Sequence, residues 1–321
     1  MAGFVRTGSS LTNDLTSLTF DLPLLIPDFL YKQTVTMLAA DPGIGKSIVS
    51  MQLAVSLSYA PPLFGTFPIP TPKRVYYLQL EGSYHQTIHR LRQMQSAIPL
   101  HTDNLCWDMA EGLNVLRDPD CLALEQRIQQ FEHPDLIIID PIYMAVIGGL
   151  SEDRPASAFV RFSNRLTQTF GCAVWLNHHT HRPRYQNGGK VEEDDSFYGS
   201  QWLKAHLDAS WIMTRGTANN RVHLTCKKDR NSVLCRRIDL LYHEDSMTCE
   251  RLHFDQTSAM TKVMTFLTEC KRRNITTTIS EIGASTGVSH AHLNRIKNEI
   301  GKIGIVTFVN SPGKSTCWIV T

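Results

Sequence analysis

Short apolar runs alternate with amphipathic stretches over the first 250 positions of the chain. The runs at 34–39 and 136–139, and those within 74–83 and 172–179, have the character of strands buried on both faces of a parallel sheet. Between them, 47–58 and 86–95 carry apolar residues at helical spacing. This alternation predicts an α/β fold with a mostly parallel sheet covered by helices.

The pattern changes after position 256. One helix around 263–267, a short helix that ends at Gly287 and a third helix opened by Ser289 are followed by two alternating strands within 305–320. Three helices and a hairpin predict a small winged-helix-like domain over 256–321, whose second and third helices form a helix-turn-helix. The larger domain then spans 1–250, with about 20 N-terminal residues expected to be disordered, and 239–256 is expected to be the linker.

Composition narrows the class of protein. The chain has 321 residues, of which 42% are hydrophobic and 19% charged, which is typical of a globular protein. Its apolar runs are far shorter than a membrane helix, and its N-terminus lacks the apolar core of a signal peptide. The eight cysteines form no CxxC pair, which argues against a zinc site or a disulfide scaffold. We therefore expect a cytoplasmic protein with reduced thiols and no membrane partner.

A phosphate-binding loop is the strongest motif in the sequence. The run DPGIGKS joins a predicted strand to a predicted helix, the context that a P-loop requires. Backbone N–H groups there would bind the phosphates of ATP, Lys46 would bridge the β- and γ-phosphates, and the Ser47 hydroxyl would bind Mg²⁺. Ala40 stands in place of the first glycine, which is tolerated if its φ is negative. The candidate cofactor-binding residues are Asp41, Pro42, Gly43, Ile44, Gly45, Lys46, Ser47 and Ile48.

Acidic residues follow two of the predicted strands. Asp140 ends the run DLIIID and is the candidate Mg²⁺ partner, the alternative being an aspartate that only caps a strand before Pro141. Glu81 ends RVYYLQLE and is the candidate general base that polarises the attacking water. The alternative for Glu81 is a helix cap for the segment 86–95.

Paired histidines end a further strand-like run, CAVWLNHH. A polar group at this position could sense the γ-phosphate and pass its presence to the following loop. His178 and His179 could instead indicate a metal, but no third ligand follows at the spacing of a metal site.

In this ordered set of motifs the chain resembles the RecA-like ATPases, and most closely the plasmid RepA hexameric helicases, with DnaB-type helicases and KaiC as more distant relatives. The resemblance covers about 22–245 and rests on DPGIGKS, YYLQLEGSYHQTIHRL, LIIIDP, GCAVWLNHH, FYGSQWLKAHLDASWIM and CKKDRN. It implies a Walker A pair at Lys46 and Ser47, a Walker B acid at Asp140, a catalytic glutamate at Glu81 and a phosphate sensor at His179.

The resemblance also implies a nucleotide site shared between subunits. Lys228 and Arg230 match a pair that relatives of the DnaB and KaiC type insert into the neighbouring ATP site, the alternative being an exposed basic turn. Asp208 stands about where RepA helicases have a proposed arginine finger, which shifts that role to Arg230, with Arg215 as a fallback.

Two segments are candidates for DNA contact. In RecA-like rings the loops after the Asp140 and His179 strands, here 148–156 and 180–196, face the central channel. The second has basic and aromatic residues that could follow single-stranded DNA, although four acidic residues next to them also fit a plain flexible loop. The tail from 256 onward carries a net charge of +5 against −3 for the remainder, which suggests a nucleic-acid contact, although a solvated basic face would give the same count. The third helix of the winged-helix-like domain could contact duplex DNA, the alternative being a protein-docking module. The candidate nucleic-acid residues are Arg182, Arg184, Tyr185, Lys190, His292, Arg295 and Lys297.

These observations predict a ring-forming ATPase, expected to be hexameric, that acts as a helicase of a plasmid, phage or other mobile element. Two alternatives use the same ATP site. One is an ATP-switched DNA-binding regulator or targeting protein, and the other is a filament-forming recombinase.

Overall fold

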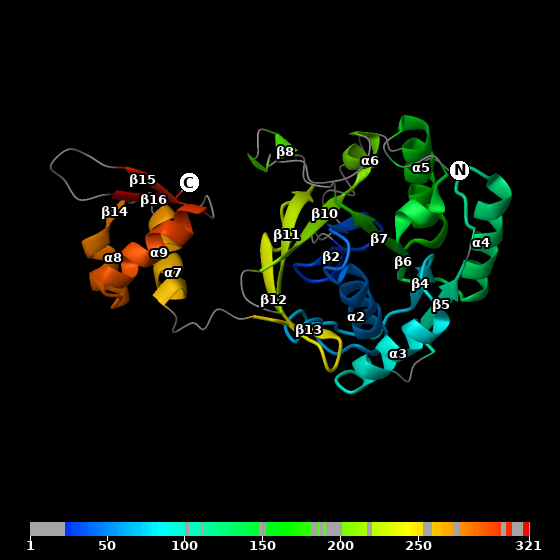
Figure 1. Ribbon diagram of the computed structural model, residues 1–321, viewed down its shortest axis with the longest axis horizontal. Helices are drawn as coiled ribbons and strands as arrows, with labels where there is room; N and C mark the ends of the chain where they lie inside the picture. Colours follow the sequence, from blue (N-terminus) through cyan, green and yellow to red (C-terminus); the bar gives the residue numbers. More distant parts are fainter. Residues whose placement is uncertain are drawn as a thin grey trace, which may run out of the picture. The chain divides into compact units, whose positions relative to one another are not determined.

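The chain divides into two compact units, Met1–Arg251 and Leu252–Thr321 (Figure 1). The computed structural model describes residues 23–99, 103–110, 112–147, 150, 152–180, 185–186, 189–190, 201–216, 220–252, 259–272, 276–302, 306–309 and 317–320. Within these residues, no helix combines the length and the hydropathy needed to cross a membrane.

The first unit is built on a sheet whose described part has nine strands in the order β13-β12-β11-β10-β3-β7-β6-β4-β5. The six strands from β10 to β5 run parallel to one another, and β11, β12 and β13 continue the sheet in antiparallel pairing. The strands are β3 (Val35–Ala40), β4 (Val75–Gln79), β5 (Leu105–Met109), β6 (Leu136–Asp140), β7 (Ala173–His179), β10 (Ala209–Arg215), β11 (Arg221–Asp229), β12 (Arg237–His243) and β13 (Thr248–Arg251). The predicted α/β class and mostly parallel sheet are confirmed.

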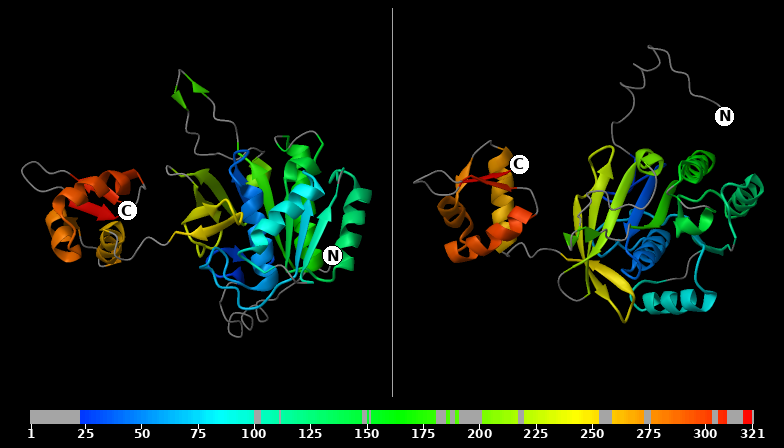
Figure 2. Two further views of the ribbon diagram at one scale, coloured as in Figure 1. Left: turned by 60° about the horizontal axis from the view of Figure 1, so that its bottom comes forward. Right: turned by 45° about the horizontal axis from the view of Figure 1, so that its top comes forward.

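Helices cover both faces of this sheet (Figures 1 and 2). One face packs against α2 (Lys46–Tyr59) and α3 (Tyr84–Gln95), and the other against α4 (Asp118–Gln130), α5 (Asp153–Phe170) and α6 (Gln201–His206). A 3₁₀ helix, η1 (Ile142–Ala145), follows β6, and two short strands, β8 (Tyr185–Gln186) and β9 (Gly189–Lys190), pair after β7. The predicted loop 148–156 extends too far, because residues 153–156 belong to α5.

A small hairpin closes the face of the sheet that carries α2. It consists of β1 (Leu24–Ile26) and β2 (Leu30–Tyr31), and the buried ring of Phe29 lies between them. Phe29 stacks on Trp175 and Trp211, with ring centroids 5.7 and 5.3 Å apart. These three rings bury a large apolar area beside α2, and such burial is a main source of folding stability.

The prediction of a linker over 239–256 is wrong for its first part, because β12 and β13 lie there. Asp239 belongs to β12, is buried, and accepts hydrogen bonds from His223 and from Nε of Arg237, the latter at 2.9 Å. These partners offset the cost of burying a carboxylate inside a strand.

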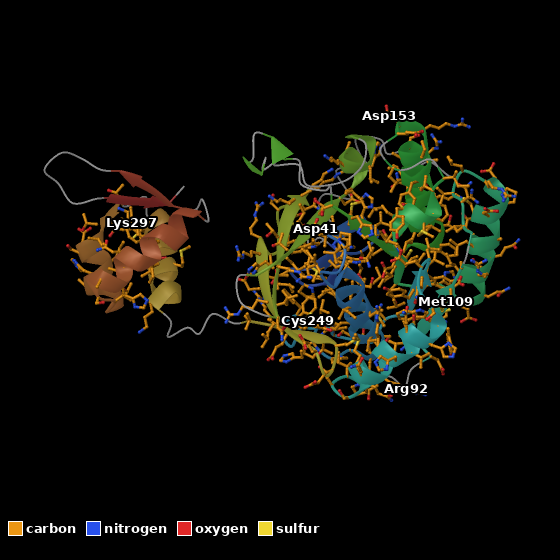
Figure 3. The ribbon with its side chains drawn as sticks, viewed as in Figure 1. Asp41, Arg92, Met109, Asp153, Cys249 and Lys297 are labelled. Carbon is orange, nitrogen blue, oxygen red and sulfur yellow. The ribbon has the colours of Figure 1, made fainter. Side chains whose placement is uncertain are left out.

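The outer side of β13 contacts other parts of the first unit. The side-chain amide of Gln52 in α2 donates to the carbonyl of Cys249 at 2.8 Å and accepts from its N–H at 2.6 Å. The N–H of Arg251 donates to the carbonyl of Phe64 at 2.9 Å. Figure 3 marks Cys249 on β13. The last strand of the sheet is thereby joined to the helix that follows the phosphate-binding loop.

The second unit has its own apolar core. Its described elements are α7 (Ala259–Arg272), β14 (Thr277–Thr278), α8 (Ile279–Thr286), α9 (His290–Lys302), β15 (Val306–Val309) and β16 (Cys317–Val320). Side chains of all three helices and of β16 form the core, including Leu267, Ile282, Leu293 and Trp318. The three helices and two strands lie where the sequence predicts them, and β14 adds a third strand to the sheet β14-β16-β15.

Candidate active site

The phosphate-binding loop connects β3 to α2. Ala40, in place of the first P-loop glycine, is the last residue of β3 and has a strand backbone that any residue adopts. Gly43 and Gly45 have φ of +75° and +108°, a region that disfavours residues with a Cβ. Gly45 is the N-cap of α2 and provides no side-chain hydrogen bond, so the first N–H groups of a 14-residue helix are available to an anion.

Lys46 and His179 meet beside this loop. Nζ of Lys46 donates to the carbonyl of Ala40 and to Nδ1 of His179, both at 3.2 Å. Burial lowers the pKa of Lys46, against the opposing effect of Asp140, Glu81 and other acidic neighbours. Burial and the adjacent Lys46 cation lower the pKa of His179. A neutral His179 that accepts at Nδ1 carries its proton on Nε2, which is then a donor suited to a phosphate oxygen.

Asp140 lies at the buried end of β6. Its Oδ2 accepts a hydrogen bond from Oη of Tyr77 at 2.6 Å, and burial together with this carboxylate raises the pKa of Tyr77 well above its usual value. Tyr77 stacks on Trp107 with centroids 3.9 Å apart, so the donor is held in place. One oxygen of this carboxylate, Oδ2, is thus bound by the protein, and Oδ1 is the oxygen that would orient a ligand of Mg²⁺ in the predicted role.

Glu81 follows β4 and does not cap α3. The N-cap of α3 is Ser83, whose hydroxyl accepts from the N–H of Gln86 in a capping box. The helix-cap alternative for Glu81 is therefore excluded. The Glu81 carboxylate instead accepts a hydrogen bond from Oη of Tyr143 in η1. The exposed side chain of Glu81 lines the cavity over the N-terminus of α2.

A cavity of about 570 Å³ lies over the N-terminus of α2. The loop 42–48, Glu81 and His179 line one part of it, and Arg90, Arg215 and Arg221 line another. Nη2 of Arg215 donates to the carbonyl of Gly43 at 3.2 Å. Three guanidinium groups and Lys46 make this cavity well suited to a polyanion. The lining residues therefore fit a nucleotide triphosphate with Mg²⁺.

Two of these arginines are not among the residues predicted from the sequence. Arg90 lies on α3, nine positions after Glu81, and the amphipathic pattern of 86–95 could have drawn attention to it. Arg221 reaches the cavity because it is the first residue of β11, which pairs antiparallel with β10 and therefore starts at the edge where β10 and β3 end. No local sequence pattern predicts that Arg221 lies at this edge.

Lys228 and Arg230 lie away from this cavity, at the other end of β11. Lys228 Nζ donates to the carbonyls of Lys204 and Ala205 at 2.8 and 2.9 Å, and Nη2 of Arg230 donates to that of Ala205 at 2.9 Å. Arg230 also pairs with Asp208 at 3.3 Å and keeps a half-exposed side chain. Both cations are thus supported by the end of α6.

Asp208 has a structural role at the place where the resemblance suggested an arginine. Its Oδ2 accepts from the N–H of Val35 at 2.9 Å, and its own N–H donates to the carbonyl of Val35 at 2.9 Å. Asp208 therefore joins the start of β3 to the turn that carries Arg230.

The remaining candidate residues are placed only in part. Arg182 and Arg184 lie outside the described residues, and Tyr185 and Lys190 pair across β8 and β9. Thr180, just before this segment, donates a hydrogen bond to Asp41, which Figure 3 marks in the phosphate-binding loop. His292, Arg295 and Lys297 lie on α9, where the side chain of His292 is exposed. The roles of these residues in DNA contact stay predictions.

Among the residues with described positions, no cluster of three or more His, Cys, Asp or Glu side chains could hold a metal by itself. The Mg²⁺ expected at Ser47 and Asp140 differs from such a site, because phosphate oxygens and water supply most of its ligands. Ser47 lines the cavity, whereas Asp140 is buried, does not line it, and acts on Lys46 through its charge.

Solved structures share the architecture of the first unit. One, an ATPase domain, is 13% identical with a TM-score of 0.57, over 76% of this chain and 97% of that one. A DnaB-like replicative helicase, described with its interactions with primase, is 13% identical with a TM-score of 0.57, over 76% and 67%. A KaiC-like protein from Pyrococcus horikoshii OT3 is 12% identical with a TM-score of 0.50, over 71% and 94%. At such identities the likeness shows the fold.

No curated protein matches the chain. The structural likeness confirms the predicted RecA-like P-loop fold. Residues 5–184, more than half of the chain, match the AAA_25 family of AAA domains. The chain therefore belongs to this family of AAA domains and has the fold of a RecA-like P-loop ATPase.

Proposed function

We propose that the chain hydrolyses ATP with Mg²⁺ and assembles into a ring that acts on DNA, as a helicase of the replicative type in a plasmid, phage or other mobile element. One observation carries the hydrolase assignment. Lys46, Glu81 and His179 come from three separate segments and line one cavity at the N-terminus of α2, and the charge of the buried Asp140 acts on Lys46 and His179. This combination of cation, carboxylate and helix terminus is what phosphoryl transfer to water requires.

In this proposal each residue has one task. Bound ATP with Mg²⁺ supplies the phosphoryl group and the metal charge. Lys46 moves from His179 to the phosphates, Ser47 binds the metal, and Asp140 orients its water. Glu81 orients the attacking water and accepts its proton, while His179 donates from Nε2 to a phosphate oxygen.

The position of Arg230 supports the ring. It follows the end of β11 at the opposite edge of the sheet from the phosphate-binding loop, so a role in hydrolysis would require the site of another subunit. Electron microscopy with and without ATP and single-stranded DNA tests the assembly. Closed rings support the proposal, filaments favour the recombinase alternative, and monomers under all conditions contradict it.

Replacing Asp140 with asparagine tests the magnesium role. We expect Asp140→Asn to lower the apparent affinity for Mg²⁺ in ATP hydrolysis about 10- to 100-fold, because substitution of residues that orient the ligands of a metal has effects of this size. The measurement is a Mg²⁺ titration of the steady-state rate at fixed ATP. Asp108→Asn is the matched control, because Asp108 on β5 also accepts from a tyrosine, Tyr76, but lies away from the cavity. Equal curves for Asp140→Asn and the wild type would remove Asp140 from the site.

The second unit is proposed to be a winged helix that binds duplex DNA. A chain that ends at Arg251 is expected to keep oligomerisation and basal ATP hydrolysis and to lose most duplex affinity. In the full chain, log K should fall against log salt with a slope of about −0.9 per phosphate contact, and the truncation should flatten this slope. Fluorescence anisotropy at several salt concentrations measures both. Equal affinities and slopes would identify the second unit as a protein-docking module.

The same truncation distinguishes the helicase from the alternative function, an ATP-switched DNA-binding regulator. The compact second unit supports that alternative, because it could bind DNA independently of the ATPase unit. A helicase keeps the stimulation of ATP hydrolysis by single-stranded DNA after truncation, because its contacts lie in 180–196. A regulator tethered by the second unit loses its response to DNA altogether.

A further inference from the structure

A tyrosine outside all of the assigned roles touches two residues of the proposed site. Tyr143 lies in η1, three positions after Asp140, and its Oη donates to Oε2 of Glu81. Its ring lies against that of His179, with centroids 5.0 Å apart and planes at 42°. Because His179 also contacts Nζ of Lys46, Tyr143 links the Glu81 carboxylate to the His179 ring and, through it, to Lys46.

The backbone of Tyr143 is held firmly on both sides. Its neighbours in η1, Ile142 and Ala145, are fully buried in the core. The carbonyl of Ala145 accepts from the N–H of Val115 at 3.0 Å, and the N–H of Met144 donates to the carbonyl of Pro141 at 3.3 Å. The hydroxyl of Tyr143 is therefore a donor at a position that the core sets.

Glu81 needs such a partner. It is exposed and lies between β4 and the N-cap of α3, next to Gly82 with a φ of +90°. A flexible carboxylate in water samples several rotamers, and only one of them can align a water with a phosphorus atom. Burial and the Glu81 carboxylate raise the pKa of Tyr143 to about 12, so the hydroxyl keeps its proton at neutral pH and remains a donor.

The geometry points to Tyr143 as the positioning residue for Glu81: its hydroxyl holds Oε2 and leaves Oε1 to bind and deprotonate the attacking water. This inference rests on the proposed function, because it assumes that Glu81 is the general base. It assigns to η1, at the start of the segment after Asp140, a direct part in the alignment of the carboxylate.

The test is Tyr143→Phe, which removes the hydroxyl and keeps the ring against His179. We expect kcat for ATP hydrolysis to fall about tenfold, a typical consequence of slight misplacement of a catalytic group. The affinity for a non-hydrolysable ATP analogue with Mg²⁺ should stay within about twofold, because Glu81 is not a phosphate ligand. Tyr84→Phe is the matched control, since Tyr84 lies nearby at the start of α3 with a side chain that is 63% exposed.

A double-mutant cycle distinguishes positioning from general damage to the fold. In a Glu81→Gln background, Tyr143→Phe should cause no further loss of the residual single-turnover rate, because its effect acts through the carboxylate. An unchanged or increased kcat in Tyr143→Phe alone, or an equal loss in both backgrounds, overturns the inference. Full hydrolysis by Glu81→Gln would instead overturn the proposed role of Glu81 and, with it, the inference. Wild-type kcat in Tyr143→Phe beside an inactive Glu81→Gln would overturn the inference alone.

Discussion

Mixing Arg230→Ala protein with Lys46→Ala protein, each inactive alone, is expected to restore ATP hydrolysis. An arginine supplied from a neighbouring subunit contributes about 10³- to 10⁵-fold to phosphoryl transfer, so loss of Arg230 should reduce the rate to background. In a mixed oligomer, an Arg230→Ala subunit still offers an intact phosphate-binding loop to the intact arginine of a Lys46→Ala neighbour. Random assembly of equal amounts makes about a quarter of the interfaces of a symmetric ring competent.

The sheet explains why Arg230 cannot serve its own subunit. Asp229 lies opposite Ala209, which is level with Thr36 in β3, whereas the loop begins after Ala40. Four residues of strand separate these levels by about 13 Å. The control mixture is Lys46→Ala with Glu81→Gln, whose defects lie in the same cavity and cannot complement one another. Absence of rescue in confirmed mixed oligomers of the first pair would argue against a shared site.

Glu81→Gln is expected to bind ATP with Mg²⁺ normally and to lower single-turnover hydrolysis about 10²- to 10⁴-fold, the usual contribution of a general base. Glutamine keeps the size of the side chain and an acceptor for Tyr143, and loses the carboxylate that takes the proton. Lys46→Ala should instead impair nucleotide binding, the step before hydrolysis. We expect its affinity for ATP to fall about a hundredfold through loss of charge-assisted hydrogen bonds.

Calorimetric titration with a non-hydrolysable analogue, beside rapid-quench hydrolysis, separates the two defects. Normal turnover by Glu81→Gln would exclude this residue as the base. Normal nucleotide affinity in Lys46→Ala would show that its contacts with Ala40 and His179 are structural.

The residues predicted well are those at the ends of parallel strands. Asp140, Glu81 and His179 each follow an apolar run, and parallel strands bring their carboxyl ends to a common edge. The order of motifs along the chain was therefore enough to predict that these side chains meet the loop that contains Lys46.

The residues that were not predicted are those whose positions depend on how the chain turns between elements. Arg221 reaches the cavity through an antiparallel return, and Tyr143 reaches Glu81 because η1 folds over the adjacent strand end. Local periodicity carries no information on either event. The strands β12 and β13 are hidden in the sequence because polar residues, Asp239 among them, interrupt the alternation of a strand. One partner of Asp239, His223, lies on the neighbouring strand β11, which local periodicity does not reveal.

The hydrogen bonds on the outer side of β13 affect how copies of this protein can associate. A terminal strand with unpaired N–H and C=O groups is a template onto which another chain adds a strand, which leads to continuous sheets and aggregates. Here the groups that point outward from Cys249 and the N–H of Arg251 are occupied by Gln52 and Phe64. Strand addition at this border would require Gln52, in the helix that follows the phosphate-binding loop, to release its two hydrogen bonds to Cys249. In the proposed ring, subunit contacts at this border would therefore use side-chain surfaces, and subunits could move against one another here without breaking a shared sheet.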